Sequence, residues 1–260
     1  MIRFAANLSM MFTEWPFLDR FQAAAEAGFE AVEYLFPYDF PPETIEARLK
    51  EFRLVQALFN LPPGDWAAGE RGIAALPGRF GEFRDGLETA LEYAEATGVK
   101  RLHLMSGIAD RRDPEALAAY EKALRFAADR LAGRGMTLLI EPINNRSMPG
   151  YLLDDFDFAE NLVRNLGITT LKLQFDIFHR QIMRGDVTES LRRLVPLIGH
   201  VQIAGVPHRH EPDGGELNLP YILETLEASG YDGFIGCEYV PAGRTLDGLG
   251  WIRSYWSDAR

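Results

Sequence analysis

Four residues with oxygen-bearing side chains, each near the end of a short apolar segment, carry the strongest chemical signal in this sequence. They are Glu141 in TLLIEPIN, Asp176 in LKLQFDIFH, Gln202 in HVQIAG and Glu238 in GFIGCEYV. If these segments are neighbouring parallel strands, the four side chains converge at the carboxyl end of one sheet, where α/β folds place their chemistry. Three carboxylates and one amide oxygen suit a hard divalent cation, Mg²⁺ or Mn²⁺ above all.

A single glutamate at a strand end more often pairs with an arginine or caps a helix. Four oxygen donors on consecutive strands favour a cation instead, because several unpaired buried carboxylates would be costly without one. A metal here could hold adjacent oxygens of an α-hydroxycarbonyl substrate and stabilise an enediolate. Glu141 and Glu238 are expected to flank that substrate as a base and acid pair, while each also binds the metal.

Four further residues are candidates for substrate binding. His179 lies three residues after Asp176 and could bind a substrate oxygen, although a loop histidine can equally bond to the backbone. Arg209 and Arg71 are candidates for a substrate carboxylate, because a guanidinium matches a carboxylate in two places; the alternative for Arg209 is a surface salt bridge. His208 is the fourth, and with the nearby second histidine of PHRHEP it forms only a weak metal motif.

Eight strand-like segments alternate with amphipathic segments whose apolar residues recur every three or four positions. This alternation in a chain of 260 residues predicts an α/β protein, a (β/α)₈ TIM barrel that forms a single domain over residues 1–260. Glycines that precede the next strand indicate helix ends, at Gly28, Gly98, Gly135, Gly167 and Gly230. The expected strands lie in residues 3–10, 31–36, 54–60, 101–107, 137–144, 171–179, 200–205 and 233–240.

Side-chain alternation refines the expected barrel. If Glu238 faces the interior, Phe234 and Gly236 also face inward, and Cys237 turns toward the helices as a buried structural thiol. Other strands offer late polar residues that would surround the mouth, namely Asn7, Glu33, Asn60 and His103.

Two long connections are expected on the active face. Residues 61–78 follow the third strand without a regular pattern, as lids and binding loops often do. Residues 205–218 follow the seventh strand and are rich in glycine, proline and charge. Trp66, together with Phe59 and Phe36, is expected to narrow the mouth and to favour a short substrate.

The formal net charge of −11 argues against non-specific binding to nucleic acid or anionic membranes. The one cysteine excludes an intrachain disulfide, so a reducing cytoplasm is expected. The first residues do not resemble a signal peptide, and no apolar run is long enough to span a membrane. The sequence has no GxGxxG, P-loop, GxSxG or CxxC motif. Hydride transfer, nucleotide hydrolysis and serine-type acyl transfer therefore lack their usual sequence support. A homo-oligomer is left open.

The sequence resembles the hydroxypyruvate isomerase family of xylose-isomerase-like barrels. The resemblance runs in order through RFAANLSMMF, FPYDF, NLPPGDWAAGERGIAALPGR, IEPIN, QFDIFH, HVQIAG, PHRHEPDGGELN and GCEY. It implies that the glutamates of IEPIN and GCEY, Glu141 and Glu238, transfer the proton. It also implies a metal set of Glu141, Asp176, Gln202 and Glu238. Gln202 stands where many related sugar epimerases carry a histidine, which favours the hydroxypyruvate branch.

A sister group, the 2-oxo-tetronate isomerases, shares most of this pattern. IEPINNRSMPGY is more similar to hydroxypyruvate isomerase, whereas MMFTEWPF, ALFN and QIAGVPHRHEPDGGE are more similar to the sister group. The expected activity is conversion of hydroxypyruvate to 2-hydroxy-3-oxopropanoate, so the expected partner is a small hydroxy-oxo acid substrate. Three alternatives are a 2-oxo-tetronate isomerase, a metal-dependent phosphodiesterase or endonuclease on the same barrel, and a non-catalytic sugar-binding module.

Overall fold

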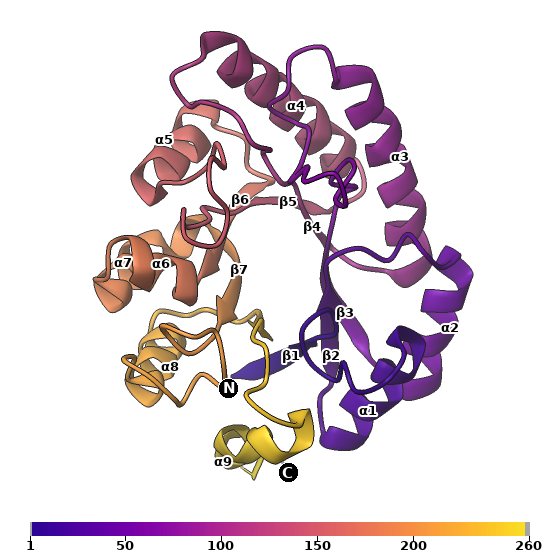
Figure 1. Cartoon of the computed structure of the whole chain (residues 1–260), viewed down its shortest axis with the longest axis vertical. Coiled ribbons are helices and arrows are strands. Elements are labelled where there is room, and N and C mark those ends of the chain that lie inside the picture. The colour runs from indigo at the N-terminus through magenta and orange to yellow at the C-terminus, as the bar shows by residue number, and fades with distance from the viewer. Residues whose placement is uncertain (1, 258–260) are drawn as a thin grey trace.

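The apolar segments form eight parallel strands that close into a barrel in the computed structural model, which describes residues 2–257. Each strand pairs with the next along the chain, and β8 returns to pair with β1. The helices surround the strands as an outer ring (Figure 1). The predicted (β/α)₈ fold is therefore confirmed. The strands are β1 (Arg3–Asn7), β2 (Ala31–Tyr34), β3 (Val55–Asn60), β4 (Arg101–His103), β5 (Thr137–Ile140), β6 (Leu171–Asp176), β7 (Ile198–Ile203) and β8 (Phe234–Cys237).

Three of the five glycines expected to end helices are helix caps. Gly28, Gly98 and Gly167 cap α1, α3 and α5 in the left-handed conformation that glycine adopts without strain. Gly135 and Gly230 instead come after the cap residues of α4 and α8. The helices are α1 (Arg20–Ala27), α2 (Pro42–Phe52), α3 (Phe80–Thr97), α4 (Pro114–Ala132), α5 (Phe156–Leu166), α6 (Ile177–Met183), α7 (Val187–Leu194), α8 (Leu219–Ala228) and α9 (Arg253–Ser257), with 3-10 segments η1 (Phe17–Asp19), η2 (Val195–Leu197) and η3 (Thr245–Ile252).

Most strands are shorter than the predicted apolar segments, and this affects the site. The sixth segment was expected to continue to His179, but β6 ends at Asp176 and α6 begins at the next residue. The carboxylate of Asp176 accepts a hydrogen bond of 2.8 Å from the backbone N–H of Phe178, which caps the new helix. Glu141 and Glu238 each lie one residue beyond their strands.

The predicted alternation holds at β8. Cys237 is fully buried in the main hydrophobic core, and Phe234 belongs to a separate cluster with one alanine each from β1, β2 and β3. Phe59 does not narrow the mouth as expected, because its ring faces Tyr38 and Tyr93 at centroid distances of 6.2 and 6.5 Å. Tyr93 belongs to α3, so Phe59 points toward the helix layer, and the next residue along the strand faces inward instead.

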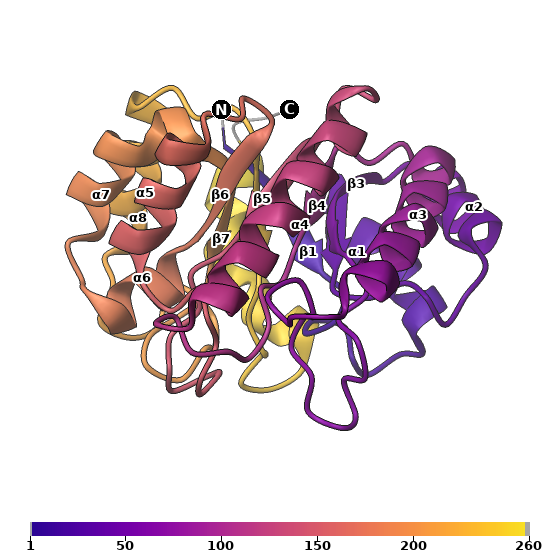
Figure 2. The same cartoon turned by 90° about the horizontal axis from the view of Figure 1, so that it is seen from above.

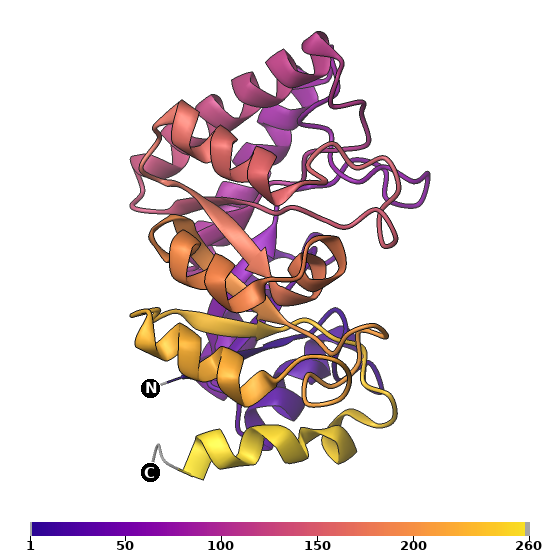
Figure 3. The same cartoon turned by 90° about the vertical axis from the view of Figure 1, so that its left-hand side faces the viewer.

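The long connections that follow the strands project from one face of the barrel. Figure 2 shows the purple loop after β3 on the face opposite to the start of β1. The C-terminal segment η3–α9, yellow in Figure 3, runs along the edge of the molecule, where Trp256 packs against Phe29 with centroids 5.3 Å apart. Among residues 2–257, no helix has the length and apolar character needed to cross a bilayer.

Candidate active site

A cavity of about 270 Å³ opens at the carboxyl end of the barrel. Its wall combines ionisable groups from several strand ends with methionine and aliphatic side chains from the loops. A pocket of mainly apolar walls with a few converging polar groups is the usual form of a small-molecule site. The lining residues are Met10, Leu35, Asn60, Trp66, Arg71, His103, Met105, Glu141, Ile143, Ser147, Met148, His179, Arg209 and Glu238.

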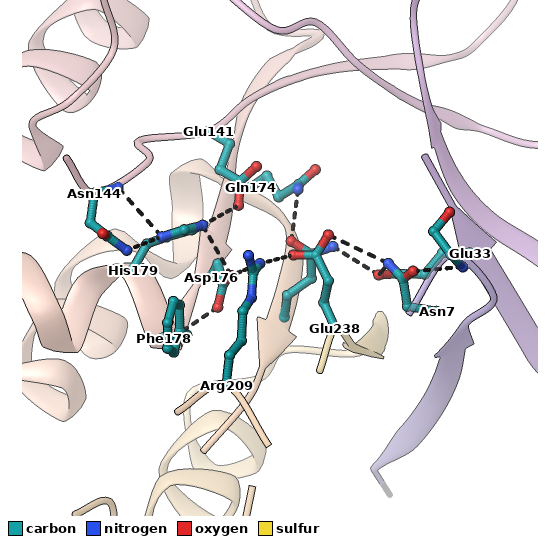
Figure 4. Close-up of polar contacts among 12 residues, drawn as sticks. Asn7, Glu33, Glu141, Asn144, Gln174, Asp176, Phe178, His179, Arg209 and Glu238 are labelled. Carbon is teal, nitrogen blue, oxygen red and sulfur yellow. Dashed lines mark hydrogen bonds and ion pairs between the residues drawn. The ribbon is translucent and has the colours of Figure 1, made fainter. Parts of the chain in front are cut away.

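Two of the predicted residues, Asp176 and Glu238, contact the guanidinium group of a third, Arg209 (Figure 4). Nη2 of Arg209 lies 2.7 Å from Oε2 of Glu238 and 3.2 Å from Oδ2 of Asp176. The same guanidinium lies over the ring of Phe178, 4.9 Å from its centroid. Arg209 therefore does not form the surface salt bridge that was the alternative reading, since both of its carboxylate partners are buried.

Two histidines extend this cluster toward Glu141. Nε2 of His179 is 3.5 Å from Oδ2 of Asp176 and 3.8 Å from Oε1 of Glu141. Nε2 of His103 is 3.7 Å from Oε2 of Glu141. Asn144 holds the other nitrogen of His179, with its amide nitrogen 2.6 Å from Nδ1. Among the described residues, Glu141, Asp176 and His179 bring potential ligand atoms within 4.8 Å of one another.

Burial dominates the protonation of this cluster. Desolvation, reinforced by the neighbouring carboxylates, raises the pKa of Glu141 well above its usual range. Desolvation raises the pKa of Glu238 to about 8, although Arg209 acts in the opposite direction. The pKa of Asp176 is also raised by burial, against the pull of Arg209. Burial lowers the pKa of His103 to about 3, with a smaller contribution from a second histidine.

Gln202 lies on β7 inside the barrel, where it is almost fully buried. Its Oε1 accepts a hydrogen bond of 2.7 Å from Nε2 of Gln174, and its Nε2 donates one of 2.8 Å to Oε1 of Glu33. β6 and β7 place Asp176 and Gln202 in register as neighbours. An amide oxygen has two lone pairs, so the bond from Gln174 leaves one for a further partner.

The donors of this site fit a divalent cation. Buried Oε1 of Glu141 and buried Nε2 of His103 have no hydrogen-bond partner in the described part of the chain. Three buried carboxylates face a single guanidinium, and burial, with a smaller contribution from neighbouring carboxylates, raises the pKa values of Glu141, Asp176 and Glu238. A cation would supply the missing positive charge and partners for the unpaired atoms.

Of the remaining predicted residues, Arg71 and Trp66 line the cavity, whereas His208 does not. Arg71 lines the cavity; its guanidinium lies over the ring of Trp66, 3.9 Å from the centroid. Trp66 also contacts the ring of Phe36 at 5.1 Å, so these two aromatic residues lie at the mouth as expected. His208 is exposed and is not among the described residues that line the cavity.

Sequence reasoning overlooked several parts of this site. Gln174 faces inward because it lies two residues before Asp176 on the same strand, a relation that period-two alternation could have revealed. Asn144, which orients His179, follows Glu141 by three residues in IEPINN, but nothing in the spacing indicates its partner. The methionines of the cavity wall, Met10, Met105 and Met148, come from loops and leave no periodic pattern.

The closed eight-stranded barrel, with carboxylates gathered at its carboxyl end, is the architecture of a TIM-barrel protein, and comparison with known sequences agrees. The family described as xylose isomerase-like TIM barrel matches residues 21–255. This protein therefore belongs to the xylose isomerase-like TIM barrel family.

Two relatives with assigned names match over nearly their whole length. The 2-oxo-tetronate isomerase of Cupriavidus necator is 54% identical, with 98% of this chain and 99% of the relative covered. The hydroxypyruvate isomerase of Escherichia coli is 45% identical, with 98% and 100% covered. The resemblance inferred from the motifs is thus confirmed, and it includes both the expected family and its sister group.

A solved structure from Brucella melitensis, described as an AP endonuclease of family 2, has the same fold in close detail. It superimposes with a TM-score of 0.96 at 52% identity, covering 98% of this chain and 99% of that chain.

Proposed function

We propose that this protein is an isomerase that converts hydroxypyruvate to 2-hydroxy-3-oxopropanoate. One observation carries the proposal: buried Glu141 and Glu238 line one small cavity in a chain closely similar to two named isomerases of hydroxy-oxo acids. A lone buried cysteine agrees with the reducing cytoplasm as its location.

The proposed metal ligands are Glu141, Asp176, Gln202 and Glu238, with Mg²⁺ or Mn²⁺ as the cation. All four contribute oxygen, which these hard cations prefer. The cation, when bound, polarises the carbonyl and hydroxyl oxygens of the substrate and offsets the negative charge that forms on them. His179 lies at the same cluster and is proposed to hold a substrate oxygen.

The two glutamates would move the proton. One carboxylate accepts a proton from C3 of hydroxypyruvate, and the electrons left behind form an enediolate. The same group or its partner then returns a proton to C2. The C3 hydroxyl gives up its proton as its oxygen becomes the new carbonyl, and the C2 oxygen takes up a proton to become the new hydroxyl, so no atoms or electrons are gained or lost. The raised pKa values of Glu141 and Glu238 suit carboxyl groups that must hold a proton between these steps.

The substrate carboxylate needs a cation of its own. Arg209 and Arg71 both line the cavity and are proposed to bind it. The loop position of Arg209 is fixed, since its backbone N–H donates to Gly205 and its carbonyl accepts from Val240. His208, which is exposed, remains a proposed contact only for a substrate that extends to the rim of the cavity.

A four-carbon 2-oxo acid is the second candidate substrate. It is favoured by the higher identity to the 2-oxo-tetronate isomerase, 54% against 45% for the hydroxypyruvate isomerase. Both acids carry a hydroxyl next to a carbonyl, so the same proton transfer serves either. An endonuclease is disfavoured because two of the five histidines line the cavity and the net charge is −11.

The test is turnover followed by NMR. Purified protein loaded with Mg²⁺ is incubated with hydroxypyruvate and, separately, with 2-oxo-tetronates. Formation of 2-hydroxy-3-oxopropanoate supports the main proposal, and conversion of the four-carbon acid alone moves the activity to the second candidate. Absence of both products, in a folded protein that binds Mg²⁺, would refute both.

A further inference from the structure

A carboxylate deeper in the barrel is held by three side chains from two other strands, β1 and β7. Glu33, in β2, is fully buried. Its Oε1 accepts hydrogen bonds from Nδ2 of Asn7 at 3.0 Å and from Nε2 of Gln202 at 2.8 Å. Its Oε2 lies 2.6 Å from Nε2 of His200, a ring nitrogen that donates in a hydrogen bond to an ionised carboxylate. Glu33 takes no part in the proposed proton transfer.

The bond to Glu33 determines which way the Gln202 amide faces. A glutamine amide has two orientations that differ only in the exchange of its oxygen and nitrogen. A carboxylate accepts from nitrogen and repels oxygen, so Glu33 holds the NH₂ group of Gln202 toward itself. The amide oxygen is thereby turned the other way, toward Gln174 and the end of β6. The reverse orientation would present an NH₂ group to a cation, which cannot bind it.

Asn7 connects the same carboxylate to a second proposed ligand. Its Nδ2 bonds to Glu33 and also lies 3.5 Å from Oε1 of Glu238 (Figure 4). Its Oδ1 accepts from the backbone N–H of Ser9, which fixes the Asn7 amide in turn. Glu33 thus stands behind two of the four proposed ligands, one directly and one through Asn7.

The chain leaves space for this carboxylate at one position of β8. A Cβ atom at Gly236 would lie 2.3 Å and 2.4 Å from the two carboxylate oxygens of Glu33, far inside van der Waals contact. Gly236 faces inward beside Gln202 in the β7–β8 register. Any side chain at Gly236 would therefore push the carboxylate away from its three donors.

We propose that Glu33 is a positioning residue that fixes the Gln202 amide with its oxygen toward the divalent cation. This inference rests on the metal site of the proposed function. Groups that orient metal ligands in this way typically account for a factor of about 10 to 100 in metal affinity. Glu33 itself touches neither the cation nor the substrate in this scheme.

The test measures the Kd of Mn²⁺ for metal-free full-length protein by titration calorimetry. Glu33→Met removes both acceptor oxygens at similar length, and we expect it to weaken Mn²⁺ binding by about 10-fold or more. Glu33→Gln keeps one oxygen for Asn7 and Gln202, and His200 can change tautomer to accept from the new amide, so its loss should be smaller. Gln56→Leu, which removes another buried barrel amide, is the control and should leave the Kd unchanged.

A double-mutant cycle separates positioning from general damage to the fold. If Glu33 acts through Gln202, Glu33→Met combined with Gln202→Ala should bind Mn²⁺ much more tightly than the product of the two single losses predicts. The proposal would be overturned if the loss of Mn²⁺ affinity in the double variant equalled the product of the two single losses. An unchanged Kd in folded Glu33→Met would overturn it as well.

If Glu33→Met does not fold, Gly236→Ala replaces it, since the added methyl group displaces the same carboxylate. A Kd for folded Gly236→Ala equal to that of the unsubstituted protein would then overturn the positioning role. An unsubstituted protein that binds no Mn²⁺ would refute the proposed metal site as well. If the protein binds Mn²⁺ tightly and the Glu33 variants have the same Kd, only the positioning role is refuted and the metal site stands.

Discussion

At the scale of single residues, Arg209 reaches two of the three carboxylates that line or border the cavity, while Glu141 contacts only histidines and neutral groups at longer range. Burial raises the pKa of both Glu141 and Asp176, and Arg209 acts against the rise in each case. The residue types and their strand-end positions were readable from the sequence. The contacts with His103 and Asn144 were not, because they depend on side-chain packing between different loops and strands.

Replacing either glutamate of the proposed proton-transfer pair should impair turnover. We expect Glu141→Gln and Glu238→Gln each to lower kcat by a factor of about 10² or more, the usual contribution of a general acid–base group. Steady-state kinetics with hydroxypyruvate provides the measurement. Because both residues are also proposed ligands, bound metal must be quantified in the same samples. A variant that is fully loaded with metal and retains the original kcat would remove that residue from the mechanism.

The raised pKa of Glu238 predicts a pH dependence of stability. Its pKa is about 8 in the folded protein against an ordinary value of 4.5, so the folded state binds this proton more tightly than the unfolded state. The unfolding free energy of the metal-free protein should therefore fall as pH rises from 4.5 toward 8. Glu238→Gln lacks this proton, and its decline should be shallower. Urea denaturation of both proteins at several pH values, with chelator present, makes the comparison; equal slopes would contradict the prediction.

Arg209 should matter for substrate affinity with either acid. We expect Arg209→Ala to raise the KM for hydroxypyruvate and for the four-carbon acid alike, because both present the same carboxylate. Arg209→Lys, which keeps the charge but loses the two-pronged geometry, should raise KM less. Exposed Arg112→Ala, whose carboxylate partner is Asp110, is the control. A KM that Arg209→Ala leaves unchanged would assign carboxylate binding to Arg71.

At the scale of elements, each strand end supplies one or two inward polar groups, and each following loop completes the wall. The sequence predicted the strand positions well because apolar segments recur eight times and five of the intervening segments end in a glycine stop. It overextended several strands, since it could not foresee that Asp176 caps α6 and so ends β6. It also misplaced Phe59, whose direction depends on where the alternation begins within the strand.

The loop between β3 and α3 should influence the choice between substrates. Trp66 lines the cavity and packs against Phe36 and Arg71, so it narrows the mouth. We expect Trp66→Ala to shift the ratio of kcat/KM values toward the four-carbon acid, because that ratio measures differential transition-state binding. Tyr221→Ala, at an exposed aromatic on α8, is the control. An unchanged ratio would show that substrate length is selected elsewhere in the cavity.

At the scale of the whole molecule, the barrel brings together residues that are distant in sequence, such as Asn7 and Glu238, which are 231 positions apart. The closed order of strands was predictable because eight repeated βα units have few other compact arrangements. The identity of the substrate was not, since three-carbon and four-carbon acids differ by one hydroxymethyl group. The loop side chains that line the cavity, such as Met105 and Met148, have no sequence signature.

The most direct test of the whole account is the metal dependence of hydroxypyruvate turnover. Protein is stripped of metal with a chelator, assayed by NMR, then loaded with Mn²⁺ and assayed again alongside Gln202→Ala. We expect the metal-free protein to lose at least about 10²-fold in rate and Mn²⁺ to restore it, with Gln202→Ala needing more metal for the same recovery. Full turnover by the metal-free protein would contradict the proposed role of the carboxylate cluster.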